Sequence, residues 1–186
     1  RWAKNKKLPI IEGHRQGIIT IKKILRKSIK LNIKYLTFYG FSTENWKRSP
    51  REINDLKELL LFYLESEIEN FVKNKINFSF IGDLSKFNNA IKKKLNELTE
   101  MTQKFSNTYF ILALGYGSRN EIIKAINNCK KDLSEVKITE KRFSQYLMTK
   151  KFPDPDFVIR TSGEMRLSNF LLWQIAYSEL YFTKTF

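Results

Sequence analysis

The chain has 186 residues, 42% of them hydrophobic, which is enough for one domain with a substantial core. Its single cysteine, Cys129, excludes an internal disulfide and a structural zinc site. No apolar run approaches the roughly 20 residues that span a bilayer, and no charged-then-apolar leader is recognised. We therefore expect a soluble or peripheral membrane protein, on the cytoplasmic side or inside an organelle.

The first part of the chain alternates between helical and strand patterns. Apolar residues at helical spacing predict a helix at 17–31, and an aromatic and β-branched run predicts a buried strand at 35–39. Ser49, Pro50 and Glu52 are typical of a helix start, with a capping serine, a proline at the first helical position and a glutamate three residues after the cap. This long helix is expected to end near residue 72, before a strand at 76–81.

The alternation continues to the end of the sequence. Helices are expected at 89–101, from Ser118 onward, at 139–148 and at 169–177, and strands at 109–114, 157–159 and 180–182. Ser118 and Glu121 have the spacing of a second capping box. Strands separated by helices predict an α/β fold with a central, mainly parallel sheet flanked by helices.

The formal net charge of +15 indicates an anionic partner, which can be a nucleic acid, an anionic lipid or a phosphorylated substrate. Arg160 and Arg166 lie on either side of a glycine-containing turn, with Ser168 and the expected helix start close behind. Forked guanidinium donors, a hydroxyl and helix-start amides suit a diphosphate. A surface loop that pairs its arginines with carboxylates explains the same residues, so both interpretations stay open here.

His14 is the only histidine, which excludes zinc clusters built on several histidines. Catalysis must then depend mainly on carboxylates and arginines. A lone histidine is often structural, but His14 lies between Gly13 and Gly17 in a basic segment, where it can equally face a phosphate.

Several segments in order resemble the motifs of the cis-prenyltransferases, the undecaprenyl and dehydrodolichyl diphosphate synthases. They are residues 1–4 (RWAK), 12–17 (EGHRQG), 41–48 (FSTENWKR), 81–83 (IGD), 115–122 (GYGSRNEI), 159–174 (IRTSGEMRLSNFLLWQ) and 176–182 (AYSELYF). The resemblance covers the whole chain. It implies condensation of isopentenyl diphosphate with an allylic diphosphate such as farnesyl diphosphate, giving a long-chain polyprenyl diphosphate, with Mg²⁺ as cofactor.

The resemblance also implies site residues. Those with catalytic roles are Asn45, His14, Ser42 and Trp46. Those that bind substrate are Arg1, Trp2, His14, Arg48, Glu52, Arg160, Arg166 and Ser168. Arg1 and His14 correspond to residues around the allylic diphosphate, the last two arginines and Ser168 to residues that hold isopentenyl diphosphate, and Glu179 to a metal ligand. Glu52 has a second explanation as part of its capping box.

The sequence departs from the family pattern at several places. The motif that usually precedes Arg1 carries an aspartate that binds magnesium, and the family usually has an arginine at the position of Ile10. We therefore expect residues 1–186 to be one catalytic domain without the extreme N-terminal metal-binding motif and the C-terminal tail. A carboxylate at Glu179, beside the apolar run 180–182, would be costly to bury alone and is expected to need a partner.

The resemblance further implies a hydrophobic cleft between the helices at 17–31 and 50–72 that receives the growing chain. It also implies a homodimer, possible membrane contact for the lipid product, and no nucleic-acid partner. Two alternatives are a non-catalytic partner subunit of an active prenyltransferase and a basic nucleic-acid-binding domain. The sequence has no helix-turn-helix, zinc-finger or ribonucleoprotein motif.

Overall fold

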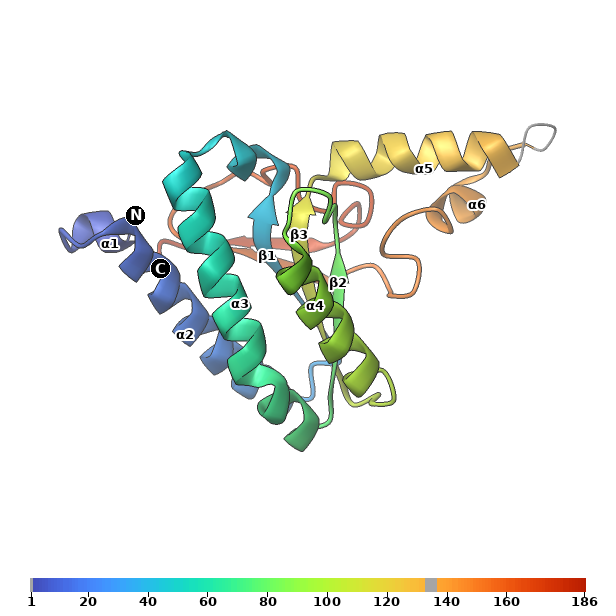
Figure 1. Cartoon of the computed structure of the whole chain (residues 1–186). Helices are drawn as coiled ribbons and strands as arrows, with labels where there is room; N and C mark the ends of the chain where they lie inside the picture. The colour runs from blue at the N-terminus through green and yellow to red at the C-terminus, as the bar shows by residue number, and fades with distance from the viewer. Residues whose placement is uncertain (1, 133–136) are drawn as a thin grey trace. The chain divides into compact units, whose positions relative to one another are not determined.

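The computed structural model describes residues 2–132 and 137–186. These residues form two compact units, which divide between Leu114 and Gly115. Figure 1 follows the chain by colour from one unit into the other. Each unit is described by itself below.

The first unit contains a three-stranded sheet and its helices. In chain order the elements are α1 (Trp2–Asn5), α2 (Ile10–Lys30), β1 (Tyr35–Ser42), the 3₁₀ helix η1 (Thr43–Lys47), α3 (Pro50–Lys73), β2 (Ile76–Ile81), α4 (Asn89–Thr102) and β3 (Thr108–Tyr116), whose last two residues enter the second unit. The strand order is β1-β3-β2. Strands β2 and β3 are parallel, with Ile76 opposite Thr108 and Ile81 opposite Ala113.

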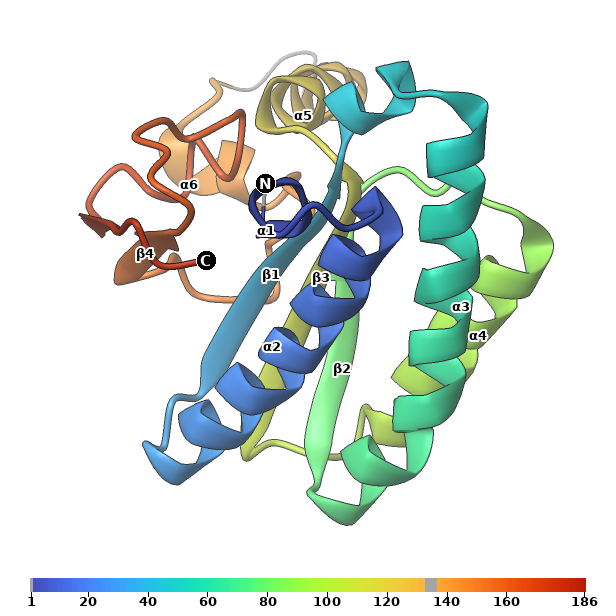
Figure 2. The same cartoon turned by 90° about the vertical axis from the view of Figure 1, so that its left-hand side faces the viewer.

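Helices α2 and α3 lie side by side along the sheet (Figure 2). The core beneath them is aromatic, and Phe71 of α3 packs edge-on against Phe78 of β2 and Phe110 of β3, all three with no exposed surface. Burial of large aromatic side chains is a principal source of stability in such a layer. The two helices therefore have a rigid base on which side chains that face each other can be positioned.

The second unit contains α5 (Ser118–Asp132), α6 (Glu140–Ser144), β4 (Phe157–Arg160) and β5 (Glu179–Phe182). Strands β4 and β5 form a parallel pair in which Phe157 faces Glu179 and Arg160 faces Phe182. A small apolar cluster of Ala125, Phe143 and Leu147, with Trp173 packed against it, joins α5 to the segments that follow.

The strands and the long helices agree with the sequence prediction, and the parallel pairing is as expected. Helix α2, however, begins at Ile10 rather than Gly17, so His14 is helical. A glycine at position 13 suits this first turn, because a Cβ there would lie only 3.2 Å from the Cβ of Ala3 in α1.

The predicted helix at 169–177 is wrong. Ser168, Asn169 and Leu171 have φ angles of 51°, 61° and 46°, which belong to the left-handed region and prevent a right-handed helix from starting there. The segment instead forms successive turns. The diphosphate argument made from helix-start amides near Asn169 therefore has no basis in this fold.

Two further details of the prediction are wrong for a common reason. Glu121 does not complete a capping box with Ser118, because its carboxylate accepts hydrogen bonds from the nearby Tyr116 hydroxyl and from two residues distant in sequence. One of these donors is the Met148 N–H, at 2.8 Å. That amide is not available to extend α6, which ends at Ser144 rather than near residue 148.

Candidate functional site

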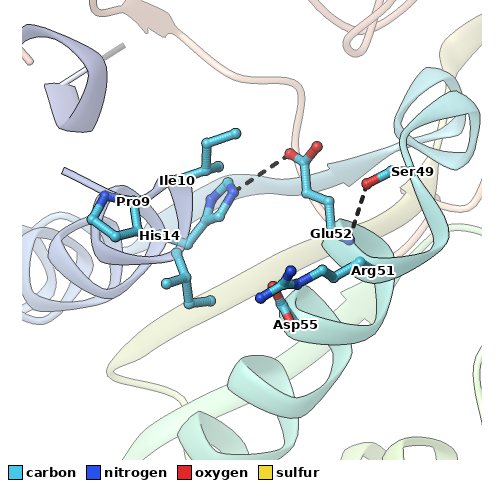
Figure 3. A pocket seen from close by; sticks show the side chains of 8 residues that line it. Pro9, Ile10, His14, Ser49, Arg51, Glu52 and Asp55 are labelled. Atoms are coloured by element: carbon cyan, nitrogen blue, oxygen red, sulfur yellow. Dashed lines mark hydrogen bonds and ion pairs between the residues drawn. The ribbon is translucent and has the colours of Figure 1, made fainter. Parts of the chain in front are cut away.

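A pocket of about 250 Å³ opens between the first turns of α2 and α3 (Figure 3). Its lining comes from the segment around the start of α2 and from the first turns of α3: Pro9, Ile10, Ile11, His14, Ser49, Arg51, Glu52 and Asp55. The Ser49 hydroxyl accepts the Glu52 N–H at 3.3 Å and so caps α3. The pocket therefore lies beside the positive end of the α3 dipole, which favours an anion.

Glu52 is the centre of a charged group at this pocket. Its Oε1 accepts a hydrogen bond from the Arg48 guanidinium at 2.8 Å and lies 3.8 Å from Nε2 of His14. Burial lowers the pKa of His14, the nearby Arg48 charge lowers it further, and Glu52 opposes the change. The His14 Nε2 is buried and has no hydrogen-bond partner among the described residues. Nε2 thus faces the Glu52 carboxylate across the pocket without forming a hydrogen bond.

Arg51 and Asp55 also line this pocket, and sequence reasoning did not select them. Arg51 makes no ion pair within the described part of the chain, so its guanidinium can bind an anion. The N-terminal motif of α3 drew attention to Ser49 and Glu52 as a helix start. The one available signal for Arg51 was its position in the first turn, where an acidic residue is favoured and a cation is not.

A longer groove of about 730 Å³ runs along α2 and α3. It shares Ile11, Arg51 and Asp55 with the smaller pocket, so the two cavities adjoin. The groove is mixed in character: its apolar lining residues are Ile11, Ile18, Ile19, Leu59, Phe62 and Tyr63, and its polar ones are Arg15, Lys22, Arg51, Asp55, Glu58 and Ser66. Together the cavities have a polar end near His14 and a groove of mixed apolar and polar lining that leads away from it.

Ser42 and Asn45 are joined by the turn that follows β1. The Ser42 N–H donates to Oδ1 of Asn45 at 2.8 Å, which fixes the start of η1. The amide NH₂ of Asn45 has no hydrogen-bond partner among the residues described, and the side chain is half-buried. This turn leaves the donor end of Asn45 available for a ligand.

The two predicted tryptophans are engaged in packing. Trp46 lies 4.5 Å from the ring of Phe41 and 5.0 Å from that of Phe87, and the ammonium groups of Lys57 and Lys86 lie over its ring. Trp2 is covered by the Lys6 ammonium at 4.8 Å. Both rings are half-buried, so their contacts explain their presence without a ligand. Arg1 lies outside the described residues.

The remaining predicted residues belong to the second unit. Arg160 ends β4, and the turn at Ser162 and Gly163, both with positive φ, leads to Arg166 and Ser168. The Arg166 guanidinium forms an ion pair with Glu164, whose side chain is 10% exposed. This contact fits the alternative in which the loop pairs its own charges. It leaves other guanidinium N–H groups of Arg166, whose side chain is 65% exposed, facing solvent.

Other polar motif residues of the second unit are structural. The buried Glu121 carboxylate accepts hydrogen bonds from the Tyr116 hydroxyl, the Met148 N–H and the Gln174 amide. The Ser118 hydroxyl accepts the Leu172 N–H at 3.0 Å, and the Arg119 N–H donates to Oδ1 of Asn169 at 2.9 Å. The motifs at 115–122 and 159–174 therefore interlock, and their spacing serves the fold of this unit.

Comparison with known proteins identifies the family. The profile of the family described as "Putative undecaprenyl diphosphate synthase" matches residues 1–186. The chain belongs to the undecaprenyl diphosphate synthase family. It is therefore an isoprenyl transferase, an enzyme that elongates prenyl chains, as the motifs predicted.

Individual members of this family are similar over nearly the whole chain. An isoprenyl transferase of Clostridium perfringens is 46% identical over 99% of this chain and 75% of its own length. One from Fusobacterium nucleatum is 48% identical over 98% and 79%. The crystal structure of lavandulyl diphosphate synthase from Lavandula x intermedia, in complex with dimethylallyl diphosphate, superimposes with a TM-score of 0.93 at 36% identity, covering 99% of this chain and 82% of that one.

A second solved structure, of a probable undecaprenyl diphosphate synthase from Campylobacter jejuni, gives a TM-score of 0.83 at 36% identity. It covers 92% of this chain and 80% of the other. The α/β fold with a mainly parallel sheet flanked by helices is thus that of the prenyltransferases. Within the described residues, no helix is both long and apolar enough to cross a membrane.

Glu179, the predicted metal ligand of this prenyltransferase, begins β5 and is exposed, so the expectation that burial forces a partner on it is wrong. Its backbone N–H donates to Asp156 O, while its carboxylate has no ion pair in the described ranges 2–132 and 137–186. Those ranges hold no group of three or more His, Cys, Asp or Glu that could bind a metal ion. Mg²⁺ commonly uses one or two carboxylates together with substrate phosphates and water, and a free exposed carboxylate fits that pattern.

Proposed function

We propose that this prenyltransferase condenses isopentenyl diphosphate with an allylic diphosphate, such as farnesyl diphosphate, and repeats the step to give a polyprenyl diphosphate. The observation that supports this most is the pair of adjoining cavities along α2 and α3. One end offers His14 and Arg51 to an anion, and the groove offers Ile18, Ile19, Leu59 and Phe62 to a hydrocarbon tail, among polar side chains. This is the shape and polarity of an allylic diphosphate with its hydrocarbon tail.

The allylic diphosphate occupies the smaller pocket in this proposal. The relative from Lavandula x intermedia holds dimethylallyl diphosphate, another allylic diphosphate. The pocket contains two carboxylates, Glu52 and Asp55. Glu52 repels a bound anion less than Asp55 does, because Glu52 is already paired with Arg48. Binding here relies on directed donors, namely the Arg51 guanidinium and the His14 ring, with Arg1 added from outside the described residues. Arg48 contributes by neutralising Glu52, and we assign Trp2 of α1 to the same substrate.

The reaction begins as the bond between the allylic carbon and the diphosphate oxygen breaks, and the diphosphate leaves with the electron pair. The double bond of isopentenyl diphosphate then attacks the allylic carbon, and loss of a proton gives a new cis double bond. Hydrogen bonds that strengthen as negative charge collects on the leaving group lower the barrier. Donors at His14 and Arg51 have this role.

Isopentenyl diphosphate is bound by Arg160, Arg166 and Ser168 in this proposal. Arg160 is the last residue of β4, and the other two come from the loop that follows it. Guanidinium groups suit a diphosphate because they donate two parallel hydrogen bonds. The free amide of Asn45 and the Ser42 turn that holds it lie after β1, and we assign Asn45 to the reacting groups. Trp46 supports that turn through its aromatic contacts rather than touching substrate.

Glu179 would hold Mg²⁺ together with diphosphate oxygens. When bound, the ion neutralises charge on the leaving diphosphate. The exposed position of Glu179 at the start of β5 makes its carboxylate accessible to such an ion. We further propose that residues 1–186 act as one catalytic domain, that the protein functions as a homodimer, and that it contacts a membrane when it releases its lipid product.

The test is incubation of the protein, including any residues that flank 1–186 in the intact chain, with farnesyl diphosphate, labelled isopentenyl diphosphate and Mg²⁺. We expect labelled polyprenyl diphosphates, resolved by chain length. A protein without turnover alone that stimulates an added active prenyltransferase would instead be the non-catalytic partner subunit. Salt-dependent binding to nucleic acid without turnover would support the nucleic-acid alternative.

A further inference from the structure

Helix α2 has a cationic outer face. The side chains that it exposes to solvent include the basic residues Arg15, Lys23, Arg26, Lys27 and Lys30. Glu12 is the one acidic residue of the helix, and its carboxylate is bonded to the Arg15 guanidinium at 2.7 Å. The other exposed cations make no ion pair within residues 2–132 and 137–186, which the structure describes. This face therefore has an excess of positive charge that the described residues do not neutralise.

The unpaired cations of α2 are close enough to repel one another. Lys23 and Lys27 are one turn apart along the helix, and so are Arg26 and Lys30. Like charges at this spacing destabilise a helix. An anionic surface laid against α2 removes the repulsion, because it supplies a counter-charge to all of these side chains at once.

Helix α3, which lies beside α2 in Figure 2, has the opposite balance of charge. Acidic residues outnumber basic ones on its exposed side, where the charged residues are Arg51, Glu58, Glu65, Glu69 and Lys73. None of these glutamates forms an ion pair with α2 in the described part of the chain. An anionic surface is attracted to α2 and repelled by the glutamates of α3, which restricts the contact to the α2 side.

Two apolar side chains of the groove are exposed beside the cationic face. Ile19 lies one turn from both Arg15 and Lys23, on the same side of α2, and is 47% exposed. Phe62 of α3 is 66% exposed. Both residues line the groove of about 730 Å³, so the groove reaches the outside of the protein at large apolar side chains. Apolar side chains beside lysine and arginine are typical of surfaces that lie in a membrane interface.

We propose that α2 docks on an anionic membrane surface, with the groove opening toward the lipid at Ile19 and Phe62. The inference rests on the proposed function, because it gives the hydrocarbon product a direct path from the groove into the bilayer. The basic side chains of α2 contact anionic headgroups, while the two apolar side chains reach the acyl chains below them. A nucleic acid also neutralises the cations, but it provides no hydrocarbon for the groove that adjoins them.

The experiment measures how much of the intact chain sediments with vesicles made of equal parts of phosphatidylglycerol and phosphatidylcholine. It compares the wild type with the variant Lys23→Gln/Arg26→Gln/Lys27→Gln/Lys30→Gln. Each cation near an anionic membrane contributes to binding, so we expect the affinity for vesicles to fall at least about 10-fold. The matched control is Lys104→Gln/Lys130→Gln/Lys141→Gln/Lys151→Gln, which lowers the net charge equally at exposed positions outside α2 and should bind like the wild type.

A second variant tests the apolar part of the contact. Ile19→Ser/Phe62→Ser should weaken binding to the same vesicles several-fold, and high salt should release the binding that remains, because only the cations then hold the protein. Wild-type affinity in this variant would show that the groove does not open toward the lipid, which overturns the proposal.

The vesicle assay separates this proposal from the proposed function because it does not depend on turnover. Equal binding by the wild type and the α2 variant overturns the proposal, and so does an equal loss in the control, since net charge then explains the binding. Wild-type protein that ignores vesicles and binds nucleic acid through α2 also overturns it. Protein that binds vesicles through α2 but makes no labelled product counts against the proposed function alone. The melting temperature of the α2 variant should not fall, since the substitutions remove like-charge repulsion, and this excludes unfolding as the cause of lost binding.

Discussion

The α2–α3 pocket and the interlocked motifs at 115–122 and 159–174 both contain polar motif residues, but they use them differently. At the pocket, His14 Nε2 makes no hydrogen bond within the described residues and only approaches Glu52 at 3.8 Å, and the Arg51 guanidinium makes no ion pair there. In the second unit, both oxygens of Glu121 accept hydrogen bonds from other parts of the chain. A motif residue that is fully bonded inside the protein supports the fold, whereas one that retains an unused donor can bind a ligand.

The largest expected effect comes from removing the Glu121 carboxylate, which accepts the buried hydrogen bonds of the second unit. Glu121→Ala removes the carboxylate that accepts from the Tyr116 hydroxyl and the Met148 N–H in a buried site, and one of the two acceptors of the Gln174 amide, which keeps the Thr149 hydroxyl. Unpaired buried groups cost about 1–3 kcal/mol each, so we expect a loss of unfolding free energy on the order of 3–5 kcal/mol. Chemical denaturation measures it. The exposed Glu140→Ala is the control, and a Glu121→Ala protein of wild-type stability would show that the network is not structural.

The sequence predicted most of the fold because the patterns that carry it are local. The apolar period placed α3 and the strands to within a few residues, and Ser49 marked the start of α3 correctly. The segment 169–177 could not be predicted in the same way. Its apolar spacing resembles a helix, but its conformation is set by Ser118, which lies far away in sequence and takes the Leu172 N–H. Long-range hydrogen bonds of this kind leave no periodic signal.

The sequence identified many residues of the candidate site, but it predicted their roles only in part. The motifs selected His14, Asn45 and Glu52, which the structure places after β1 or on the facing turns of α2 and α3. The sequence could not show that Trp46 is packed between Phe41 and Phe87, or that Glu179 is exposed. Burial of a single side chain depends on tertiary neighbours, and the sequence next to Glu179 suggested the opposite of what is found.

The second prediction tests Glu179, an exposed residue of the second unit. Because Glu179 is exposed and its carboxylate is unpaired within the described residues, Glu179→Gln should leave stability unchanged. If it binds Mg²⁺, turnover should fall on the order of 100-fold, and the Mg²⁺ concentration for half-maximal rate should rise. Steady-state rates across a Mg²⁺ titration measure both, with exposed Asp154→Asn as the control. Normal rates with a normal titration would place the metal elsewhere.

The third prediction separates the two arginines of the loop after β4. Arg160→Ala and Arg166→Ala should each raise the KM for isopentenyl diphosphate about 10- to 100-fold, since each removes charge-assisted hydrogen bonds worth about 1.5–3 kcal/mol. Only Arg166→Ala also leaves the nearly buried Glu164 without the ion pair seen here, so it should lose stability as well. Exposed Lys151→Ala is the control. An unchanged KM in both variants would mean that the loop pairs its own charges and binds no substrate.

The smallest expected effect concerns the pH dependence of stability at the open pocket. Burial and the Arg48 charge hold the folded-state pKa of His14 below 6.5, its ordinary value, which we take for the unfolded chain. Between these two pKa values the unfolded chain binds a proton that the folded protein does not, so stability rises with pH there. The contribution of His14 is complete above pH 6.5 and is lost as the pH falls toward the folded-state pKa.

The melting temperature should therefore fall more steeply between about pH 7.5 and 5.5 for the wild type than for His14→Gln, which cannot take up the proton. Glu52→Gln removes the one nearby group that favours the charged ring, so its melting temperature should fall more steeply still. Parallel curves for all three proteins would show that the His14 ring titrates as if it were in water, and that its buried nitrogen is not held apart from solvent as the pocket geometry requires.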